Sequence, residues 1–143
     1  MLDWLILADD ILKVIIAVLC GIFAGQLRES DDNREGVNSH ILIAVVACLM
    51  TLVSTNTLFR EPGFGTFSIA LGMGLIGAGV IISERGSRES IKLALTLWLS
   101  AGLGMAIGAS FYLEVASVVF LTYIGKILFN RLTKSGMKMK SDQ

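Results

Sequence analysis

The feature that most constrains this chain is a series of five apolar stretches separated by polar segments. The stretches cover residues 11–27, 41–59, 67–82, 93–113 and 115–129. A helix needs roughly 20 residues to cross about 30 Å of hydrocarbon, so the shorter stretches must recruit flanking residues. Within them only Lys13 and Lys126 are charged, each close enough to an end for its side chain to reach the headgroups. The sequence predicts an all-α integral membrane protein, a bundle of five transmembrane helices.

The basic residues predict the orientation of this bundle. Of the 12 Lys and Arg residues, all but Lys13 and Arg60 fall on one side of the membrane. That side holds Arg28, Arg34, Arg85, Arg88, Lys92, Lys126, Arg131, Lys134, Lys138 and Lys140. Because Lys and Arg are enriched in cytoplasmic loops, we expect the N-terminus outside and the C-terminus in the cytoplasm. We expect residues 1–131 to form the transmembrane domain and residues 132–143 a short basic cytoplasmic tail.

The composition supports a membrane protein. The chain is 54% hydrophobic and 17% charged, which is unusual for a soluble domain. Residues 1–10 hold three acidic residues and no basic one, unlike a signal peptide, so the first helix is expected to stay attached. Cys20 and Cys48 lie within apolar stretches and are expected to be packing groups, with a disulfide or metal pair as the less favoured alternative.

Glycine is concentrated on three of the expected helices, where small residues let helix backbones approach closely. The glycines expected to mediate helix packing are Gly21, Gly25, Gly72, Gly74, Gly77, Gly79, Gly102, Gly104 and Gly108. We expect the third stretch, which holds four of them, to lie at the centre of the bundle; alternatively it is partly unwound around a ligand. Residues 72–77 also match a dinucleotide-binding glycine pattern, but no strand precedes them, so the match predicts no cofactor.

Individual polar residues leave alternatives open. His40, at the cytoplasmic start of the second stretch, is either a pH-sensitive group, acting alone or in a site with Arg28, or a residue that borders the interface. Trp98 is expected to pack between helices. Thr96 and Ser100 bond to preceding carbonyls or a neighbouring helix, or else they line a polar path.

Two polar clusters also have two interpretations each. Hydroxyl and amide residues at positions 51–57 form either the end of a helix or a vestibule. Asp31, Asp32 and Glu35 suggest a magnesium-sensing loop because hard cations prefer carboxylate oxygens, although a solvated loop balanced by Arg28 and Arg34 is the simpler interpretation. The sequence shows no nucleophile–base pair, metal-ligand cluster or phosphate loop. We therefore expect that the protein is not an enzyme and that it binds no metal, no cofactor and no nucleic acid.

The order of four short motifs resembles the MgtC/SapB family. These motifs are Gly25 with Arg28, Gly36 followed by Ser39-His40-Ile41-Leu42, the run from Gly72 to Ile81, and Thr96-Leu97-Trp98. The similarity covers roughly residues 11–120. It implies a bacterial inner-membrane protein with about five transmembrane helices, associated with low-magnesium adaptation, survival inside host cells and modulation of the ATP synthase. It also places Arg28, His40, Thr96 and Trp98 in a candidate polar site.

The chain departs from the family pattern near the cytoplasmic helix ends. Leu27 replaces the acidic partner of Arg28, and residues 36–40 lack a usual Arg. Ser90, Lys92 and Leu93 replace a glycine and two threonines. The polar site is therefore expected to be depleted while the scaffold glycines are kept. Many relatives also carry a soluble C-terminal domain, whereas only residues 132–143 follow here, so a role of that domain is not transferred.

Two functional classes remain from the sequence. The favoured one is a non-enzymatic regulatory or assembly protein linked to magnesium homeostasis or stress adaptation, which contacts the lipid bilayer and forms a homodimer or joins another membrane protein complex. The alternative is a channel or transporter for a cation or small solute. The lack of ionisable residues at mid-membrane argues against a transporter, because such residues usually mark ion pathways, but it leaves room for a pore lined by backbone or hydroxyl groups.

Overall fold

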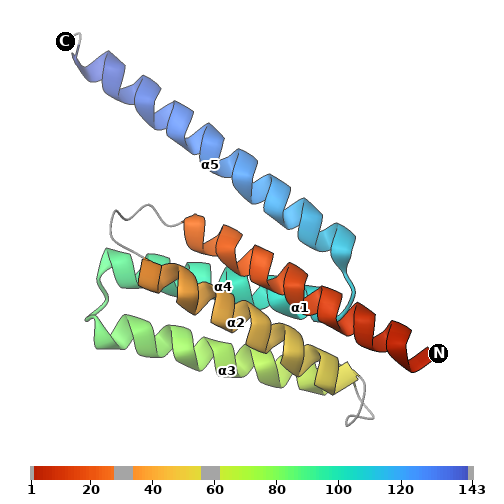
Figure 1. Ribbon diagram of the computed structural model, residues 1–143. Helices are drawn as coiled ribbons and strands as arrows, with labels where there is room; N and C mark the ends of the chain where they lie inside the picture. The colour runs from red at the N-terminus through yellow and green to blue at the C-terminus, as the bar shows by residue number, and fades with distance from the viewer. Residues whose placement is uncertain (1, 28–33, 56–61, 142–143) are drawn as a thin grey trace. The chain divides into compact units, whose positions relative to one another are not determined.

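The computed structural model describes residues 2–27, 34–55 and 62–141, which form five helices (Figure 1). The helices are α1 (Leu2–Gln26), α2 (Arg34–Val53), α3 (Pro62–Ser83), α4 (Arg88–Gly108) and α5 (Tyr112–Ser141). The predicted all-helical fold is confirmed for these described residues. The chain divides into two compact units, Met1–Phe111 and Tyr112–Gln143, and the second unit contains α5.

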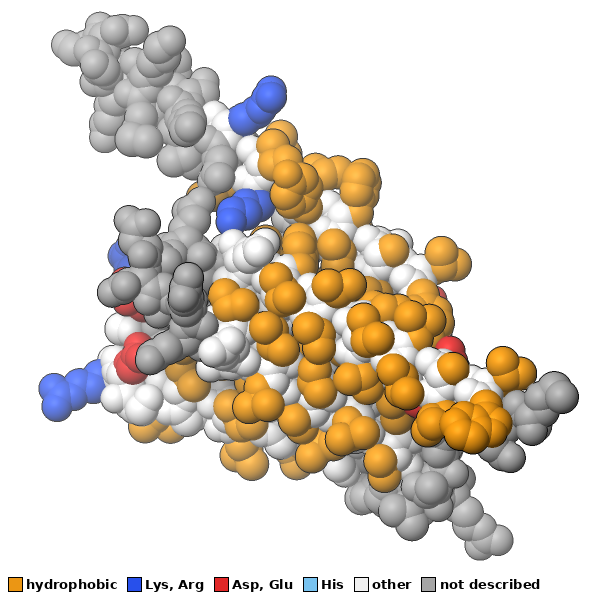
Figure 2. Space-filling view, in the orientation of Figure 1, with side chains coloured by type: hydrophobic (Ala, Val, Ile, Leu, Met, Phe, Trp, Pro, Cys, Tyr) orange, Lys and Arg blue, Asp and Glu red, His pale blue; other side chains and the backbone are white. Residues whose placement is uncertain are grey.

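Four of the described helices are long and apolar enough to cross a membrane. The qualifying segments are Gly36–Val53, Gly65–Ser83, Arg88–Gly108 and Tyr112–Phe129. The helix α1 has 25 residues, but each of its 18-residue segments contains Asp9, Asp10 and Lys13. Hydrophobic side chains cover most of the molecular face in Figure 2. The length and composition of these helices are those of a multi-pass membrane protein.

The centre of the first unit is formed by α2 and α4. The helix α1 packs against both, α2 and α4 pack against each other, and α3 packs mainly against α4. The core side chains that α2 and α4 contribute are mostly small: Ala44, Ala47, Cys48, Ala94 and Ala101. Only 11% of the apolar segment of α3 is buried. The expectation that the third stretch lies at the centre is therefore wrong, because close packing also depends on small residues in the opposing helix.

The boundary between α4 and α5 differs from the prediction, which continued the fourth helix to residue 113. The helix α4 ends at Gly108, and residues 109–111 form the connection to α5. The amide of Phe111 donates to the carbonyl of Ala106 at 2.9 Å, and the amide of Ser110 donates to that of Ile107 at 2.9 Å. This is a Schellman pattern, with Ser110 at φ 67° where glycine is usual. Hydropathy does not mark this boundary because the apolar sequence continues through it.

Other helix ends also lie beyond the predicted spans. Residues 2–10 continue α1, and α2 begins at Arg34 rather than near residue 41. The connection between α3 and α4 is limited to residues 84–87 because the Ser87 hydroxyl accepts a hydrogen bond from the Ser90 amide and caps α4. The helix α5 continues past residue 129 to Ser141. The helices therefore extend beyond the apolar stretches at these ends, which hydropathy alone does not predict.

Candidate functional site

Among the glycines of the described residues, Gly104 makes the closest approach to another helix, where α4 meets α2, and Gly108 lies in the same contact. A Cβ atom built on Gly104 would collide with the carbonyl oxygen of Ala44, and one built on Gly108 would lie 2.7 Å from the carbonyl oxygen of Cys48. Separations this short are not available to real Cβ atoms, so any larger residue forces the helices apart. The absence of a side chain at both glycines is therefore what allows α2 and α4 to approach so closely.

A second close contact joins α1 and α2. A Cβ atom built on Gly21 would lie 2.6 Å from Cα of Ile41, and one built on Gly25 would lie 3.1 Å from Cα of Val37. The space at Gly25 is larger because the nearest backbone atom is further away. The helix α2 is thus held on two sides by glycine faces, one from α1 and one from α4.

The glycines of α3 are divided between two faces of the helix. Gly74 and Gly77 lie under the indole of Trp98, with built Cβ atoms 3.5 and 3.3 Å from it. Gly72 and Gly79 have no atom of another described residue within 4 Å. Because they are seven residues apart, they share one face of the helix, roughly opposite the face of Gly74 and Gly77.

Two other residues of the predicted packing faces and polar site, Trp98 and Gly102, are at least partly exposed. Trp98 remains 47% exposed although it covers two glycines of α3. Gly102 on α4 has nothing within 4 Å among the residues the structure describes. The prediction that Trp98 packs between helices therefore describes only one side of the ring, and Gly102 lies outside the close contacts of its own helix.

His40 joins α2 to α4 inside the bundle. Its side chain is fully buried, with Nδ1 2.5 Å from the carbonyl oxygen of Gly36 and Nε2 2.9 Å from Oγ1 of Thr96. A carbonyl can only accept, so we assign the ring proton to Nδ1, and a neutral ring then accepts the Thr96 hydroxyl at Nε2. The carbonyl oxygens of Lys92 and Leu93, 3.1 and 3.0 Å from Oγ1 of Thr96, compete for the same hydroxyl proton.

The structure therefore assembles only part of the predicted polar site. His40 and Thr96 are brought together, while Trp98 turns toward α3. Arg28 and the acidic loop at positions 31–35 lie outside the described side chains, so their interpretations stay predictions. The Ser100 hydroxyl donates to the carbonyl of Thr96 at 3.1 Å, which agrees with the prediction that it bonds to a preceding carbonyl of its own helix.

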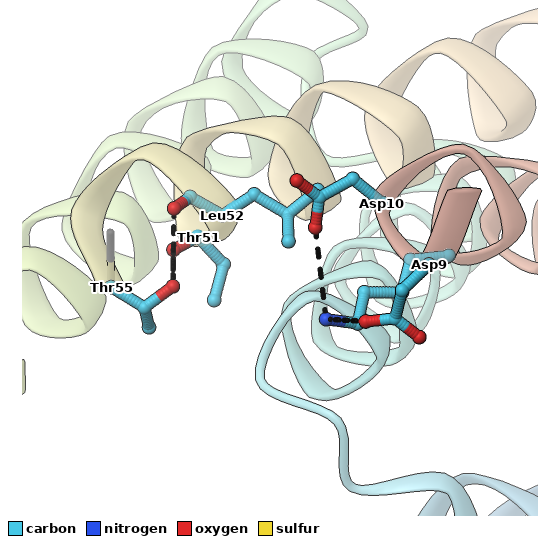
Figure 3. Close-up of polar contacts among 6 residues, drawn as sticks. Asp9, Asp10, Thr51, Leu52 and Thr55 are labelled. Carbon is cyan, nitrogen blue, oxygen red and sulfur yellow. Dashed lines mark hydrogen bonds and ion pairs between the residues drawn. The ribbon is translucent and has the colours of Figure 1, made fainter. Parts of the chain in front are cut away.

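A charged cluster on α1 was missed by the sequence analysis. Lys13 is only 8% exposed, so its side chain is buried among protein atoms rather than extended away from the bundle. Its Nζ lies 2.6 Å from Oδ2 of Asp9 and 3.8 Å from Oδ1 of Asp10 (Figure 3). The spacing of three and four residues between these groups is the helical ion-pair pattern and is the signal that could have found the cluster.

This cluster borders a cavity of about 520 Å³, which we call the charged cavity. Its lining comes from α1 and from the ends of α2 and α4: Leu5, Ile6, Asp9, Asp10, Lys13, Leu52, Thr55, Gly108, Ala109 and Ser110. The Thr55 hydroxyl donates to the carbonyls of Thr51 and Leu52 at 3.0 and 3.1 Å, so it closes the end of α2 while also facing the cavity. The helix-ending interpretation of the polar run at positions 51–57 thus holds for Thr55, the vestibule interpretation stays a prediction, and residues 56 and 57 lie outside the described residues.

The charged cavity and the histidine bridge lie at different levels of the bundle. His40 and Leu52 are 12 residues apart on α2, which corresponds to about 18 Å at roughly 1.5 Å per residue. Across the part of the chain that is described, no three His, Cys, Asp or Glu residues gather as a metal site. Cys20 and Cys48 are buried free thiols. Among the described residues, the polar features that we consider for function are the buried contact between His40 and Thr96 and the charged cavity, which holds both acidic and basic groups.

Comparison with known proteins assigns the chain to a family. The model of the MgtC family matches residues 14–135, most of the chain. The chain belongs to the MgtC family. The resemblance drawn from its motifs is thereby confirmed, and all nine predicted packing glycines, with His40, Thr96 and Trp98, lie inside the matched segment. Asp9, Asp10 and Lys13 precede it.

Individual MgtC-family relatives are moderately similar. The chain is 36% identical to Protein SapB of Bacillus subtilis, covering 85% of this chain and 57% of that protein. It is 30% identical to Protein MgtC of Salmonella typhimurium, covering 82% and 51%. It is 27% identical to the Putative magnesium transporter YhiD of Escherichia coli, covering 73% and 53%. The chain thus spans about half the length of these curated relatives, and no solved structure matches it.

Proposed function

We propose that this chain forms the membrane-embedded part of a non-enzymatic regulatory or assembly protein linked to magnesium homeostasis or stress adaptation. Membership of the MgtC family supports the setting, and one relative is named a putative magnesium transporter. All five helices cross the bacterial inner membrane, with the N-terminus outside and the C-terminus in the cytoplasm. The distribution of Lys and Arg supports this orientation.

The proposal includes α1 as a fifth span. The helix is long enough to cross, and three of its four charged residues, Asp9, Asp10 and Lys13, lie together as ion pairs rather than apart. Burial of Lys13 against Asp9 lowers the cost of carrying a cation into the bundle, because a paired charge costs far less than an isolated one. Labelling a cysteine placed in residues 28–33 from the cytoplasmic side of inverted vesicles tests the crossing.

The observation that carries the proposal is the division of the glycines. The helix α3 uses Gly74 and Gly77 against Trp98, whereas Gly72 and Gly79 on the opposite face meet nothing within 4 Å in the described structure. In lipid, helix association depends on close packing at small residues. This face supports contact with another helix, from a second copy of the chain or from a different membrane protein.

Association of the full chain tests this function. Two differently tagged copies are expressed together in the native membrane, and co-purification in mild detergent is measured for wild type, for Gly72→Leu with Gly79→Leu, and for Gly102→Leu. Gly102 is the matched control because it is equally open but lies on α4. We expect the double variant to lose its partner and the control to keep it. Retention of the partner by all three proteins would remove the support for this face.

The alternative of a cation or small-solute transporter is favoured by the charged cavity, where Asp10, Lys13 and Thr55 line a space of about 520 Å³. Transport is tested by reconstituting the purified chain alone in vesicles and following magnesium and proton uptake. Sustained flux above empty vesicles would replace the regulatory proposal. Absence of flux, together with a stable partner in the native membrane, would retain it.

A further inference from the structure

The charged cavity opens beside a second hollow of opposite character. This apolar groove also measures about 520 Å³ and is lined by Ile11, Val14 and Ile15 of α1 with Leu49, Leu52, Val53 of α2 and the charged residue Asp10. Asp10 and Leu52 border both hollows. A polar compartment formed by α1, α2 and the end of α4 therefore adjoins an apolar compartment formed by α1 and α2, and the two share a pair of lining residues.

We propose that the two hollows form one binding site for a phospholipid with a primary ammonium headgroup, whose head occupies the charged cavity and whose acyl chain follows the apolar groove. The proposal goes beyond the magnesium-linked function and does not depend on it. It requires only that α1 and α2 lie in a membrane.

The charges of the cavity favour an ammonium group. Asp9 and Asp10 together carry one more charge than Lys13 neutralises. Lys13 is held closely by Asp9 at 2.6 Å, whereas the Asp10 oxygen lies at 3.8 Å, and Asp10 also borders the apolar groove, which Asp9 does not. Asp10 is therefore the carboxylate that an incoming ammonium can approach, since it is the less engaged of the two.

The helix ends around the cavity add to this preference. The helices α2 and α4 both finish here, with Thr55 and Gly108 among the lining residues. The carboxyl end of a helix carries partial negative charge, which favours a cation nearby. A phospholipid of this class also carries a phosphate next to the ammonium. The Lys13 ammonium lines the same cavity and supplies a positive charge for this phosphate.

The order of the two hollows matches the depth profile of a lipid. The charged cavity lies where α2 and α4 end, at the boundary of the apolar segments Gly36–Val53 and Arg88–Gly108. The groove runs from Asp10 toward Ile15 on α1 and Leu49 on α2, alongside the segment Gly36–Val53. A lipid seated this way has its head at the membrane surface and its chain in the hydrocarbon, because the polar end of the site faces the boundary.

The test compares lipids on the delipidated full chain in detergent. Binding of phosphatidylethanolamine, phosphatidylcholine and phosphatidylglycerol with equal acyl chains is measured by native mass spectrometry, together with free ethanolamine and MgCl2. We expect phosphatidylethanolamine to bind at least tenfold more tightly than the other two lipids, and free ethanolamine to compete weakly because it lacks the chain. Equal binding of the three lipids, or binding of ethanolamine or Mg²⁺ as tight as that of the lipid, would overturn the proposal.

Variants locate the site. Asp10→Asn is expected to reduce the preference for phosphatidylethanolamine about tenfold. Leu49→Trp fills the groove and is expected to weaken the binding of all three lipids. Glu89→Gln is the matched control, because Glu89 lies in the first turn of α4, at the end away from the cavity. Circular dichroism and gel filtration check that each variant is folded. A preference that survives Asp10→Asn in folded protein would contradict the assignment of the headgroup to this cavity.

Discussion

The interface between α2 and α4 and the outer face of α3 are both rich in glycine, yet they differ in what the glycines do. Gly104 and Gly108 lie against backbone carbonyls of α2, whereas Gly72 and Gly79 have open space beside them among the described residues. The opposing helix makes the difference, because α2 offers Ala44 and Cys48 at the contact points. A glycine in a membrane helix thus permits close approach, but the partner sequence decides whether that approach occurs.

The largest effect is expected at Gly104. Replacing it with Ala places a methyl group on the Ala44 carbonyl oxygen, so α2 and α4 must separate, and we expect the free energy of unfolding to fall by about 3 kcal/mol. Unfolding of the purified protein in mixed micelles measures this. Gly102→Ala, two residues away on the same helix, is the matched control and should change stability by less than about 0.5 kcal/mol or raise it slightly. Equal losses at both positions would erase the distinction between packed and open glycines.

A smaller effect is expected from the polar part of the same interface. Thr96→Val keeps the shape of the side chain but leaves Nε2 of the buried His40 without this hydroxyl, which should cost about 1–2 kcal/mol. Thr96→Ser retains the hydroxyl and should lose less than half as much. The same unfolding titration separates the two variants. A Val variant as stable as wild type would show that the hydroxyl bonds only to the carbonyls of its own helix.

The contact between α3 and α4 should be weaker still. Trp98→Ala removes the ring that covers Gly74 and Gly77, but this ring is already half exposed, so we expect a loss of about 1 kcal/mol. Disulfide trapping between cysteines introduced near these positions on α3 and α4 reports whether α3 has moved. Trapping that is as fast in the Ala variant as in wild type would show that other contacts hold α3.

The smallest effect on the isolated protein is expected on the outer face of α3. Gly72→Ala and Gly79→Ala meet no neighbour in the described structure and replace a poor helix former with a better one, so stability should stay unchanged or rise by up to about 1 kcal/mol each. Thermal unfolding of the detergent-solubilised chain measures this. A loss comparable to that of Gly104→Ala would show that this face is already packed within one chain.

Hydropathy and residue spacing predict part of this picture. The apolar stretches predict the presence of the helices because a long run of apolar residues is typical of a membrane-spanning helix. They place the break between the fourth and fifth helices at residue 114 rather than at Ser110, since neither hydrophobicity nor proline interrupts the sequence at Ser110. The bridge between His40 and Thr96 joins residues 56 positions apart, which no local pattern reveals. The pairing of Lys13 with Asp9 is different, because its spacing of four residues was visible in the sequence.

The placement of that ion pair has a consequence for how the protein enters the membrane. Unpaired charges disfavour the insertion of a helix into the membrane, so Asp9, Asp10 and Lys13 would disfavour α1 as an entering segment if they were unpaired. Both counter-ions of Lys13 belong to the same helix, within one turn of it. The charge of Lys13 is therefore compensated within α1 as soon as this helix leaves the ribosome. Integration of α1 into the membrane need not wait for the synthesis of α2 or α4.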